Sequence, residues 1–149
     1  MADAPRKSLQ LKYDLAGTGQ HQAAGEPSRC ILVVDDDADV TRFIGAVLRS
    51  RGFQTVSAYD AVQGFMVAQR QRPRLILVDW HMPAGGGPEM LRKLRDNHHT
   101  SSIPVVVVTS DSAPNLPAEA ATLGAKLFLH KPLEPDRLAE IVAQLLGAD

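Results

Sequence analysis

Short, continuous apolar segments recur along residues 29–149 of this 149-residue chain and alternate with segments of helical periodicity. Such runs are typical of strands that are buried on both faces. We assign strands to five segments: 31–34, 53–59, 75–79, 103–110 and 126–130. Strands that alternate with helices in this way predict an α/β domain, in which helices cover both faces of one parallel sheet.

Apolar positions at helical spacing predict which side of each intervening helix packs on the sheet. The first stripe comprises Val40, Phe43, Ile44, Val47 and Leu48. The second stripe comprises Val62, Phe65, Met66 and Gln69. Asp60 precedes that second helix and is its expected N-cap. Two prolines, Pro114 and Pro117, leave room for only a short fourth helix over about 118–124, which reduces a surface that could meet partners.

Residues 1–28 differ in composition from the rest of the chain, since they are rich in Gly, Ala, Gln and other polar residues. We expect a flexible extension there, ahead of a domain over 29–149. Within the extension, Leu9, Leu11, Tyr13 and Leu15 alternate with polar residues, which is the period of a half-buried strand. Chance explains so short a window most simply. The alternative is a strand that docks on the domain or on a partner.

Composition and charge narrow the possible functions. The formal net charge of −1 gives no global field that would attract nucleic acid or an anionic membrane. No apolar stretch approaches the ~18 residues that span a bilayer, and residues 1–17 lack the apolar core of a secretory signal. The single cysteine, Cys30, fits a reducing compartment. We therefore expect a cytoplasmic protein with no nucleic-acid partner and no membrane insertion.

Polar residues suited to chemistry follow the apolar runs. Asp35 and Asp36 follow the first strand, Asp79 and Thr109 end the third and fourth runs, and Lys131 follows the fifth. The carboxyl ends of parallel strands share one edge of the sheet, so these side chains should converge. Clustered carboxylates repel one another unless a cation neutralises them, and an all-oxygen set suits Mg²⁺. With a cation present, Asp79 can act as a nucleophile toward a phosphoryl group.

Four motifs, VVDDD, LILVDWHMP, VVVVTS and HKP, occur in that order, with Thr109 30 residues and Lys131 52 residues after Asp79. Together they resemble the receiver domain of two-component response regulators over about residues 29–147, in particular a stand-alone, chemotaxis-regulator-like receiver. The resemblance implies a flavodoxin-like, doubly wound fold with strand order 2-1-3-4-5. It also implies a signalling phosphoprotein rather than an enzyme. Its phosphoryl donor would be a sensor histidine kinase or a histidine phosphotransfer protein.

The resemblance assigns the acceptor and the metal ligands residue by residue. It implies that Asp79 is the phosphoacceptor and that the cofactor is Mg²⁺. Asp36 corresponds to the direct metal ligand and Asp35 to a ligand that acts through water. Asp79 itself and the backbone carbonyl of His81 would complete the protein's share of the coordination.

The resemblance also implies a switch. Thr109 and Lys131 correspond to the residues that contact the phosphate, and Phe128 corresponds to the switch aromatic. The Lys131–Pro132 bond matches a bond that is usually cis in the family. We expect no effector domain beyond residue 149, so the output would be protein binding or onward phosphotransfer through the fourth helix, fifth strand and fifth helix.

Two features depart from the usual family pattern. His81 and Asp111 lie two residues after Asp79 and Thr109, at positions that tune dephosphorylation in the family. Our hypothesis is that they pair across the mouth of the site and shield an acyl phosphate from water. The glycine pair at 86–87 stands where Asp-Gly is common, so we expect a looser acceptor loop, with Gly87 shaping the turn.

Other functions were weighed against this one. Asp37, Asp39 and Thr41 fit the DxDxT signature of haloacid-dehalogenase-like phosphohydrolases, but Asp37 lies beyond the strand end, and no segment is available for a cap domain. We interpret Asp37 and Asp39 as acids that favour the start of the first helix. A receiver fold that binds partners without phosphorylation remains an alternative. A flavodoxin-like FMN module is disfavoured, because acids after the first strand would repel its phosphate.

Overall fold

The centre of the computed structural model is a sheet of five parallel strands in the order β2-β1-β3-β4-β5. The structure describes residues 30–147. The strands are Cys30–Val34 (β1), Gln54–Ala58 (β2), Leu75–Val78 (β3), Val105–Thr109 (β4) and Leu127–His130 (β5). This order confirms the flavodoxin-like fold that we expected.

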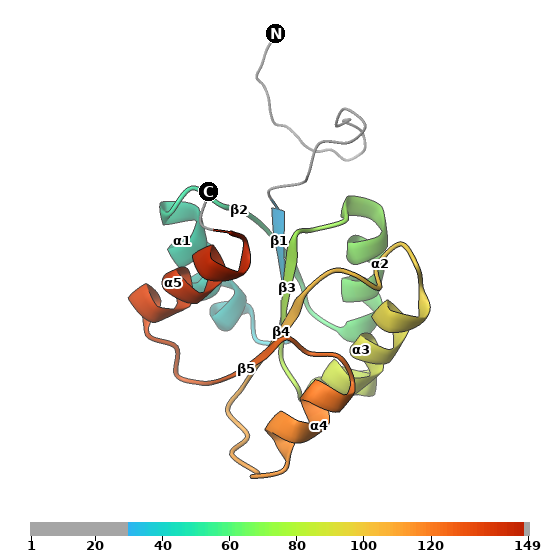
Figure 1. Cartoon of the computed structure of the whole chain (residues 1–149). Helices are drawn as coiled ribbons and strands as arrows, with labels where there is room; N and C mark the ends of the chain where they lie inside the picture. The colour runs from blue at the N-terminus through green and yellow to red at the C-terminus, as the bar shows by residue number, and fades with distance from the viewer. Residues whose placement is uncertain (1–29, 148–149) are drawn as a thin grey trace, which may run out of the picture.

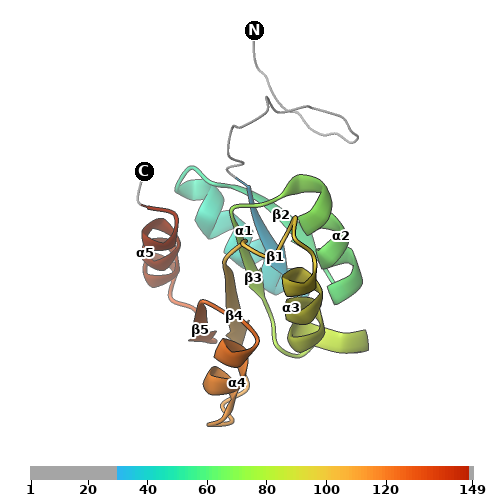
Figure 2. The ribbon, with the colours of Figure 1, turned by 45° about the vertical axis from the view of Figure 1, so that its right-hand side comes forward.

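Helices form a layer on each face of the sheet. They are Ala38–Ser50 (α1), Ala61–Gln71 (α2), Gly86–Asp96 (α3), Leu116–Thr122 (α4) and Pro135–Leu145 (α5), with a short 3-10 turn, Pro83–Gly85 (η1), ahead of α3. Figure 1 shows the sheet between α1 and α5 on one side and α2, α3 and α4 on the other. In the turned view of Figure 2, α5 and α2 again lie on opposite sides of the sheet.

Successive residues of each central strand face opposite helical layers and so build two apolar clusters. In β1, Leu32 and Val34 belong to the cluster under α2, α3 and α4, whereas Ile31 and Val33 belong to the cluster under α1 and α5. Every residue of β3 and β4 is buried, as expected for strands covered on both faces. Since β1, β3 and β4 run in register, their carboxyl ends meet at one edge of the sheet.

Acidic side chains cap the first two helices. Asp37 is the N-cap of α1 and its Oδ1 accepts a hydrogen bond of 2.9 Å from the backbone N–H of Asp39. Asp60 is the N-cap of α2 and accepts a bond of 2.7 Å from the N–H of Gln63. Both predicted helix-start roles are therefore confirmed, and Asp37 serves as a cap for α1.

The predicted inner face of α2 was wrong for Val62, Met66 and Gln69, whereas Phe65 packs against the core as expected. Val62 and Met66 are about half exposed, while the buried residues of this helix are Ala61, Gly64 and Ala68. A Cβ atom at Gly64 would lie 3.0 Å from the Met90 side chain, so the small residue allows α2 to approach α3 closely. The close contact with α3 therefore decides which side of α2 is buried, and it selects small residues over most of the larger apolar stripe.

Two other predictions on the helices had different outcomes. In α1, Ile44 and Leu48 are buried as expected, but Phe43 is 42% exposed and does not belong to the inner face. The fourth helix is short as predicted, with seven residues, although it begins at Leu116, ahead of Pro117. Proline is tolerated in the first turn, where its missing N–H has no helical partner.

The expected extension over 1–28, and the alternating residues within it, lie outside the described residues. Among residues 30–147, no helix is both long and apolar enough to cross a bilayer.

Candidate functional site

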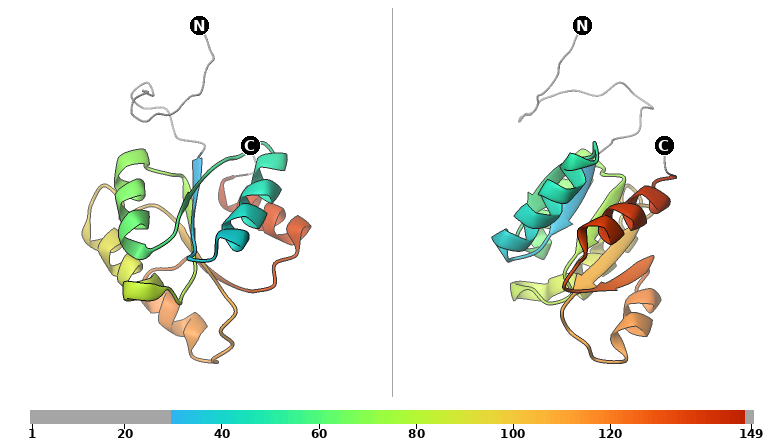
Figure 3. Two further views of the ribbon diagram at one scale, coloured as in Figure 1. Left: turned by 180° about the vertical axis from the view of Figure 1, so that it is seen from behind. Right: turned by 90° about the vertical axis from the view of Figure 1, so that its left-hand side faces the viewer.

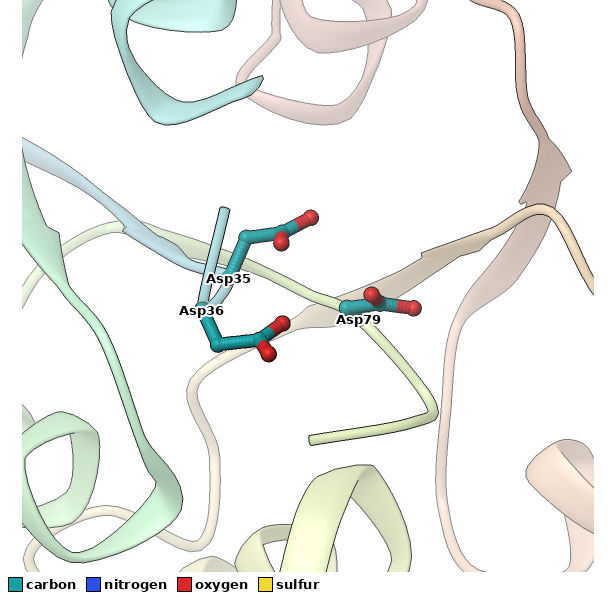
Figure 4. A group of neighbouring side chains, drawn as sticks. All are labelled: Asp35, Asp36 and Asp79. Carbon is teal, nitrogen blue, oxygen red and sulfur yellow. The ribbon is translucent and has the colours of Figure 1, made fainter. Parts of the chain in front are cut away.

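Carboxylates gather where β1 and β3 end. The backbone N–H of Asp79 donates to the carbonyl of Val34 over 3.0 Å, and the N–H of Asp35 donates to the carbonyl of Ala58 over 3.1 Å. These bonds continue the sheet by one residue and fix both acids beside each other at its carboxyl edge. Figure 4 shows Asp35, Asp36 and Asp79 side by side, with their carboxylates directed toward the same space.

The three carboxylates form a set of oxygen donors. One oxygen from each of Asp35, Asp36 and Asp79 lies within 4.8 Å of the others. Asp35 is buried and Asp36 is exposed, so the cluster spans the boundary between the core and solvent. Two or three carboxylate oxygens with an open, hydrated side match the preference of Mg²⁺ for oxygen ligands and retained waters. The residues present therefore fit a magnesium ion.

Lys131 lies against this cluster. Its Nζ is 2.8 Å from Oδ2 of Asp35 and 3.5 Å from Oδ2 of Asp79. Its backbone N–H donates to the carbonyl of Thr109 over 2.8 Å, and its peptide bond to Pro132 is cis, as the family resemblance implied. The ammonium thus neutralises part of the negative charge. Its pairing with Asp35 was not predicted, because sequence analysis considered the lysine only as a phosphate ligand.

Burial and charge act in opposite directions on this pair. Burial raises the pKa of the Asp35 carboxyl, and the hydrogen bonds from Lys131 and from the backbone N–H of Asp37 offset only part of that rise. Burial alone would lower the pKa of Lys131, but the hydrogen bond and the negative charge of Asp35, with a further contribution from Asp79, raise it overall. The lysine is therefore held firmly in its charged form beside the acids.

Thr109 and Phe128 come from neighbouring strands. The side chain of Thr109, the last residue of β4, is buried, and its hydroxyl oxygen accepts a bond of 3.3 Å from the backbone N–H of Asp111. Phe128, in β5, is half-buried and packs against the cluster under α2, α3 and α4. The expected phosphate-contacting hydroxyl therefore lies at the same edge as Lys131, and the aromatic ring packs on the face of the sheet that α4 covers.

His81 and Asp111 meet across the mouth of the site. Nε2 of His81 pairs with Oδ2 of Asp111, although the two residues belong to different loops. Asp111 also accepts a bond of 2.9 Å from the backbone N–H of Ala113. The hydrogen bond from His81, followed by that from Ala113, lowers the pKa of Asp111. The pairing in our hypothesis is therefore present, whereas the shielding of an acyl phosphate stays a prediction.

The acceptor loop is tightly packed, in contrast to the loose loop that we expected. The N–H of Gly87 donates to the carbonyl of Trp80 over 2.9 Å. A Cβ atom at Gly86, where φ is +57°, would lie 2.6 Å from that carbonyl oxygen. A Cβ atom at Gly87 would lie 2.9 Å from the carbonyl oxygen of Asp79. The glycines therefore let the start of α3 approach the backbone of the acceptor loop.

Trp80 lies in the core, although it directly follows the candidate acceptor Asp79. Its side chain is only 5% exposed and joins the cluster under α2, α3 and α4. The residue follows Asp79 directly, so one side of the acceptor loop is anchored in the core. No apolar pattern signals this burial, because Trp80 stands between two polar residues.

Comparisons with known proteins agree with this geometry. The family model for the response regulator receiver domain matches residues 31–143. The phosphate regulon transcriptional regulatory protein PhoB of Pseudomonas aeruginosa is 31% identical over 117 residues, which cover 78% of this chain and 50% of that protein. The autoinducer sensor kinase/phosphatase CqsS of Vibrio cholerae is 34% identical over 116 residues, covering 77% of this chain and 17% of CqsS. The chain thus spans half or less of these curated relatives.

Solved structures share the fold. The chemotaxis protein CheY4 of Vibrio cholerae is 25% identical, with a TM-score of 0.75 over 81% of this chain and 100% of CheY4. The receiver domain of NtrX from Brucella abortus is 27% identical, with a TM-score of 0.73 over 80% of this chain and 99% of that domain.

Proposed function

This chain belongs to the response regulator receiver domain family, and on that premise we propose that it accepts a phosphoryl group on Asp79 in a two-component or phosphorelay pathway. The observation that carries the proposal is the convergence of three carboxylates, a lysine and a threonine at one sheet edge. Asp79 lies beside both the other two acids and Lys131, and it is partly accessible to a donor.

The metal in this proposal is Mg²⁺. Asp36 and Asp79 would bind it directly, Asp35 would bind it through water, and the backbone carbonyl of His81 would supply a further ligand. When bound, the ion offsets negative charge on the carboxylates and on the phosphoryl oxygens.

In the transfer itself, a carboxylate oxygen of Asp79 attacks the phosphorus of a phosphohistidine. A P–O bond forms on the aspartate while the P–N bond to the donor imidazole breaks, and the imidazole nitrogen keeps the electron pair and takes up a proton. Lys131, already 3.5 Å from Asp79, stabilises charge on the transferring oxygens. The protein's contribution is positioning and charge, as is usual for phosphoryl transfer.

The response follows from competition for Lys131 and Thr109. A phosphoryl group on Asp79 offers both residues new oxygen acceptors, which draws the lysine from Asp35 and the hydroxyl from the N–H of Asp111. Phe128 lies in the adjacent strand and turns inward as Thr109 moves. The size of this shift is set by how much more tightly one conformation of the site holds the phosphoryl group than the other conformation does.

The partners in this proposal are defined by the chemistry. The donor is a sensor histidine kinase or a histidine phosphotransfer protein, and the reaction takes place in the cytoplasm. The surface formed by α4, β5 and α5 carries the output to a protein target or to onward phosphotransfer. The relatives named above include a transcriptional regulator and a sensor kinase/phosphatase, so this kind of domain occurs in both settings.

Trp80 gives a direct test. Because this buried indole follows Asp79, we expect its fluorescence to change when Mg²⁺ and then beryllofluoride, a phosphoryl mimic, are added. The change should be absent in Asp79→Asn and retained in Asp37→Asn, which removes a neighbouring charge but keeps a capping side chain. A wild-type protein that binds neither Mg²⁺ nor beryllofluoride would contradict the proposal and would favour binding without phosphorylation.

A further inference from the structure

Large apolar side chains are exposed beside β2. Tyr59, Val62 and Met66 are 44%, 52% and 49% exposed, and the neighbouring Val56 and Phe65 are half-buried. We refer to these five residues as the β2–α2 patch. Contiguous exposed apolar surface of this kind marks a binding site more often than scattered single residues do.

The patch borders the open edge of the sheet. Gly64 lies against Met90 of α3, and positions 62 and 66 are each two residues away, or ~200° around the helix, so they face away from α3. Val56 and Phe65 belong to the apolar cluster under α2, α3 and α4 and form its incompletely covered border. Within the part of the chain that the structure describes, β2 is the last strand on this side, and Figure 3 (left) shows α1 and α2 on either side of it.

The chain before residue 30 leaves the domain at the far end of the two elements that carry this patch, since Tyr59 and Val62 lie where β2 ends and α2 begins. Cys30, the first residue of β1, is in register with Gln54, the first residue of β2. Its Sγ also lies 4.0 Å from Oε1 of Gln71, the last residue of α2. Both elements that form the patch therefore begin or end at the point where the preceding segment emerges.

A segment of matching character lies within reach. Leu9, Leu11, Tyr13 and Leu15 alternate with Gln10, Lys12 and Asp14, so an extended chain would place all four apolar side chains on one side. The connection over 16–29 can span up to ~46 Å when extended, whereas α2 is only ~16 Å long. The connection is therefore long enough for residues 9–15 to lie beside β2 either parallel or antiparallel to it.

We infer that residues 9–15 add to the outer edge of β2 as a sixth strand and cover the β2–α2 patch. The outward N–H and C=O groups of an edge strand accept such a partner through main-chain hydrogen bonds. The apolar side of the added strand extends the cluster beyond Val56 and Phe65, and the polar side faces the opposite layer. This interaction is independent of the phosphoacceptor function proposed above.

Disulfide formation in the full chain tests this inference. In a Cys30→Ala background, one cysteine replaces Met66 and a second replaces each residue from 9 to 15 in turn. We expect rapid intramolecular bridges at one or more of positions 9, 11, 13 and 15, and roughly tenfold slower bridging at 10, 12 and 14, because alternate residues of a strand face opposite sides. Unchanged circular dichroism and Trp80 fluorescence would show that each variant is folded.

Three results would overturn the inference. Equal rates at odd and even positions would mean that the segment meets α2 only by chance collisions. Bridges formed only between chains would identify a second copy as the occupant. An absence of bridges at all seven positions would mean that the segment does not cover the patch.

Amide hydrogen exchange provides an independent measurement. Exchange at Thr55 and Ser57 in β2 should be faster when Leu11 and Tyr13 are both replaced by Asp, since the added strand would be lost. The matched control replaces Gln10 and Lys12 by Asp and should leave exchange unchanged. Equal exchange in the two variants would contradict strand addition.

Discussion

At the scale of single residues, the site contains more negative charge than its one lysine can neutralise. Lys131 contacts Asp35 and Asp79, whereas no ion pair from Lys131 to Asp36 is formed. Asp36 is the exposed member of the cluster. Its negative charge repels the other two carboxylates and is not offset by a direct contact with that lysine. This imbalance is what a divalent cation would correct.

Replacement of Asp36 should therefore stabilise the protein in the absence of divalent cations. We expect Asp36→Asn to raise the free energy of unfolding by about 1 kcal/mol, because its like-charge interactions with Asp35 and Asp79, whose oxygens lie within 4.8 Å, are removed at a largely solvated position. Urea unfolding with a chelator measures this change. Asp37→Asn is the control, since it removes an adjacent charge, retains the cap and should have little effect. A destabilised Asp36→Asn would show that the cluster is not under repulsion.

The His81–Asp111 pair should set the lifetime of the phosphorylated state. If it shields the acyl phosphate, His81→Ala should accelerate loss of phosphate by roughly tenfold, equivalent to about 1.4 kcal/mol in the barrier. The decay of ³²P-labelled protein after removal of the donor gives the rate. His98→Ala, on an exposed loop remote from the site, is the control. An unchanged decay rate in His81→Ala would eliminate the shielding role.

How much of the site the sequence predicts depends on where each residue stands relative to a strand end. Asp35, Asp79 and Thr109 follow or end apolar runs, so the parallel sheet alone predicts their convergence. The contact between Lys131 and Asp35 is less predictable, because it depends on side-chain geometry over a separation of 96 residues. The roles of these residues in phosphorylation stay predictions.

At the scale of elements, the junction between the acceptor loop and α3 requires glycine. Gly86→Ala should lower the free energy of unfolding by about 3 kcal/mol or more, because it combines an unfavourable backbone conformation with a clash against the Trp80 carbonyl. Gly52→Ala is the matched control: φ there is +92°, but nothing lies within 4 Å of the added Cβ. We expect that variant to lose only about 1 kcal/mol. Equal losses in urea unfolding would show that the close approach is not needed.

Arg95 links α3 to two other segments, the connection between α3 and β4 and the connection between α4 and β5. Its guanidinium donates to the carbonyls of Ser101, Ile103 and Gly124 at 2.9, 3.2 and 2.8 Å. Arg95→Met leaves these acceptors without their donor and should cost about 2–3 kcal/mol of unfolding free energy. Arg92→Met, at an exposed position of the same helix, should change stability by less than about 0.5 kcal/mol. Similar values for the two variants in thermal unfolding would contradict a bridging role.

The elements differ in how well apolar periodicity predicts their packing. In α5 the large apolar residues Leu138, Ile141 and Val142 recur at helical spacing and all three are buried. In α2 most of the larger apolar stripe is not buried, because contact with α3 selects Gly64 and the flanking alanines for the buried side. Apolar periodicity shows which side of a helix is apolar. The distance between two helices decides which side chains are small enough to be buried between them.

At the scale of the whole molecule, metal binding should be coupled to stability. A ligand that binds only the folded state stabilises it by about 1.4 kcal/mol at a tenfold excess over its Kd. We therefore expect Mg²⁺ to raise the melting temperature of the wild-type protein, and to do so much less in Asp36→Asn. Na₂SO₄ and MgSO₄ series at matched ionic strength distinguish site binding from screening. An equal effect of Mg²⁺ on both proteins would place the ion elsewhere.

Lys131 connects two distant parts of the domain. Its backbone N–H donates to the carbonyl of Thr109 and its ammonium pairs with Asp35, so one residue links β4 to the end of β1. The backbone anchor holds the residue in place, while its flexible four-carbon stem lets the ammonium move. A group that attracts the ammonium would therefore free the acid after β1 and leave the backbone bond to Thr109 intact.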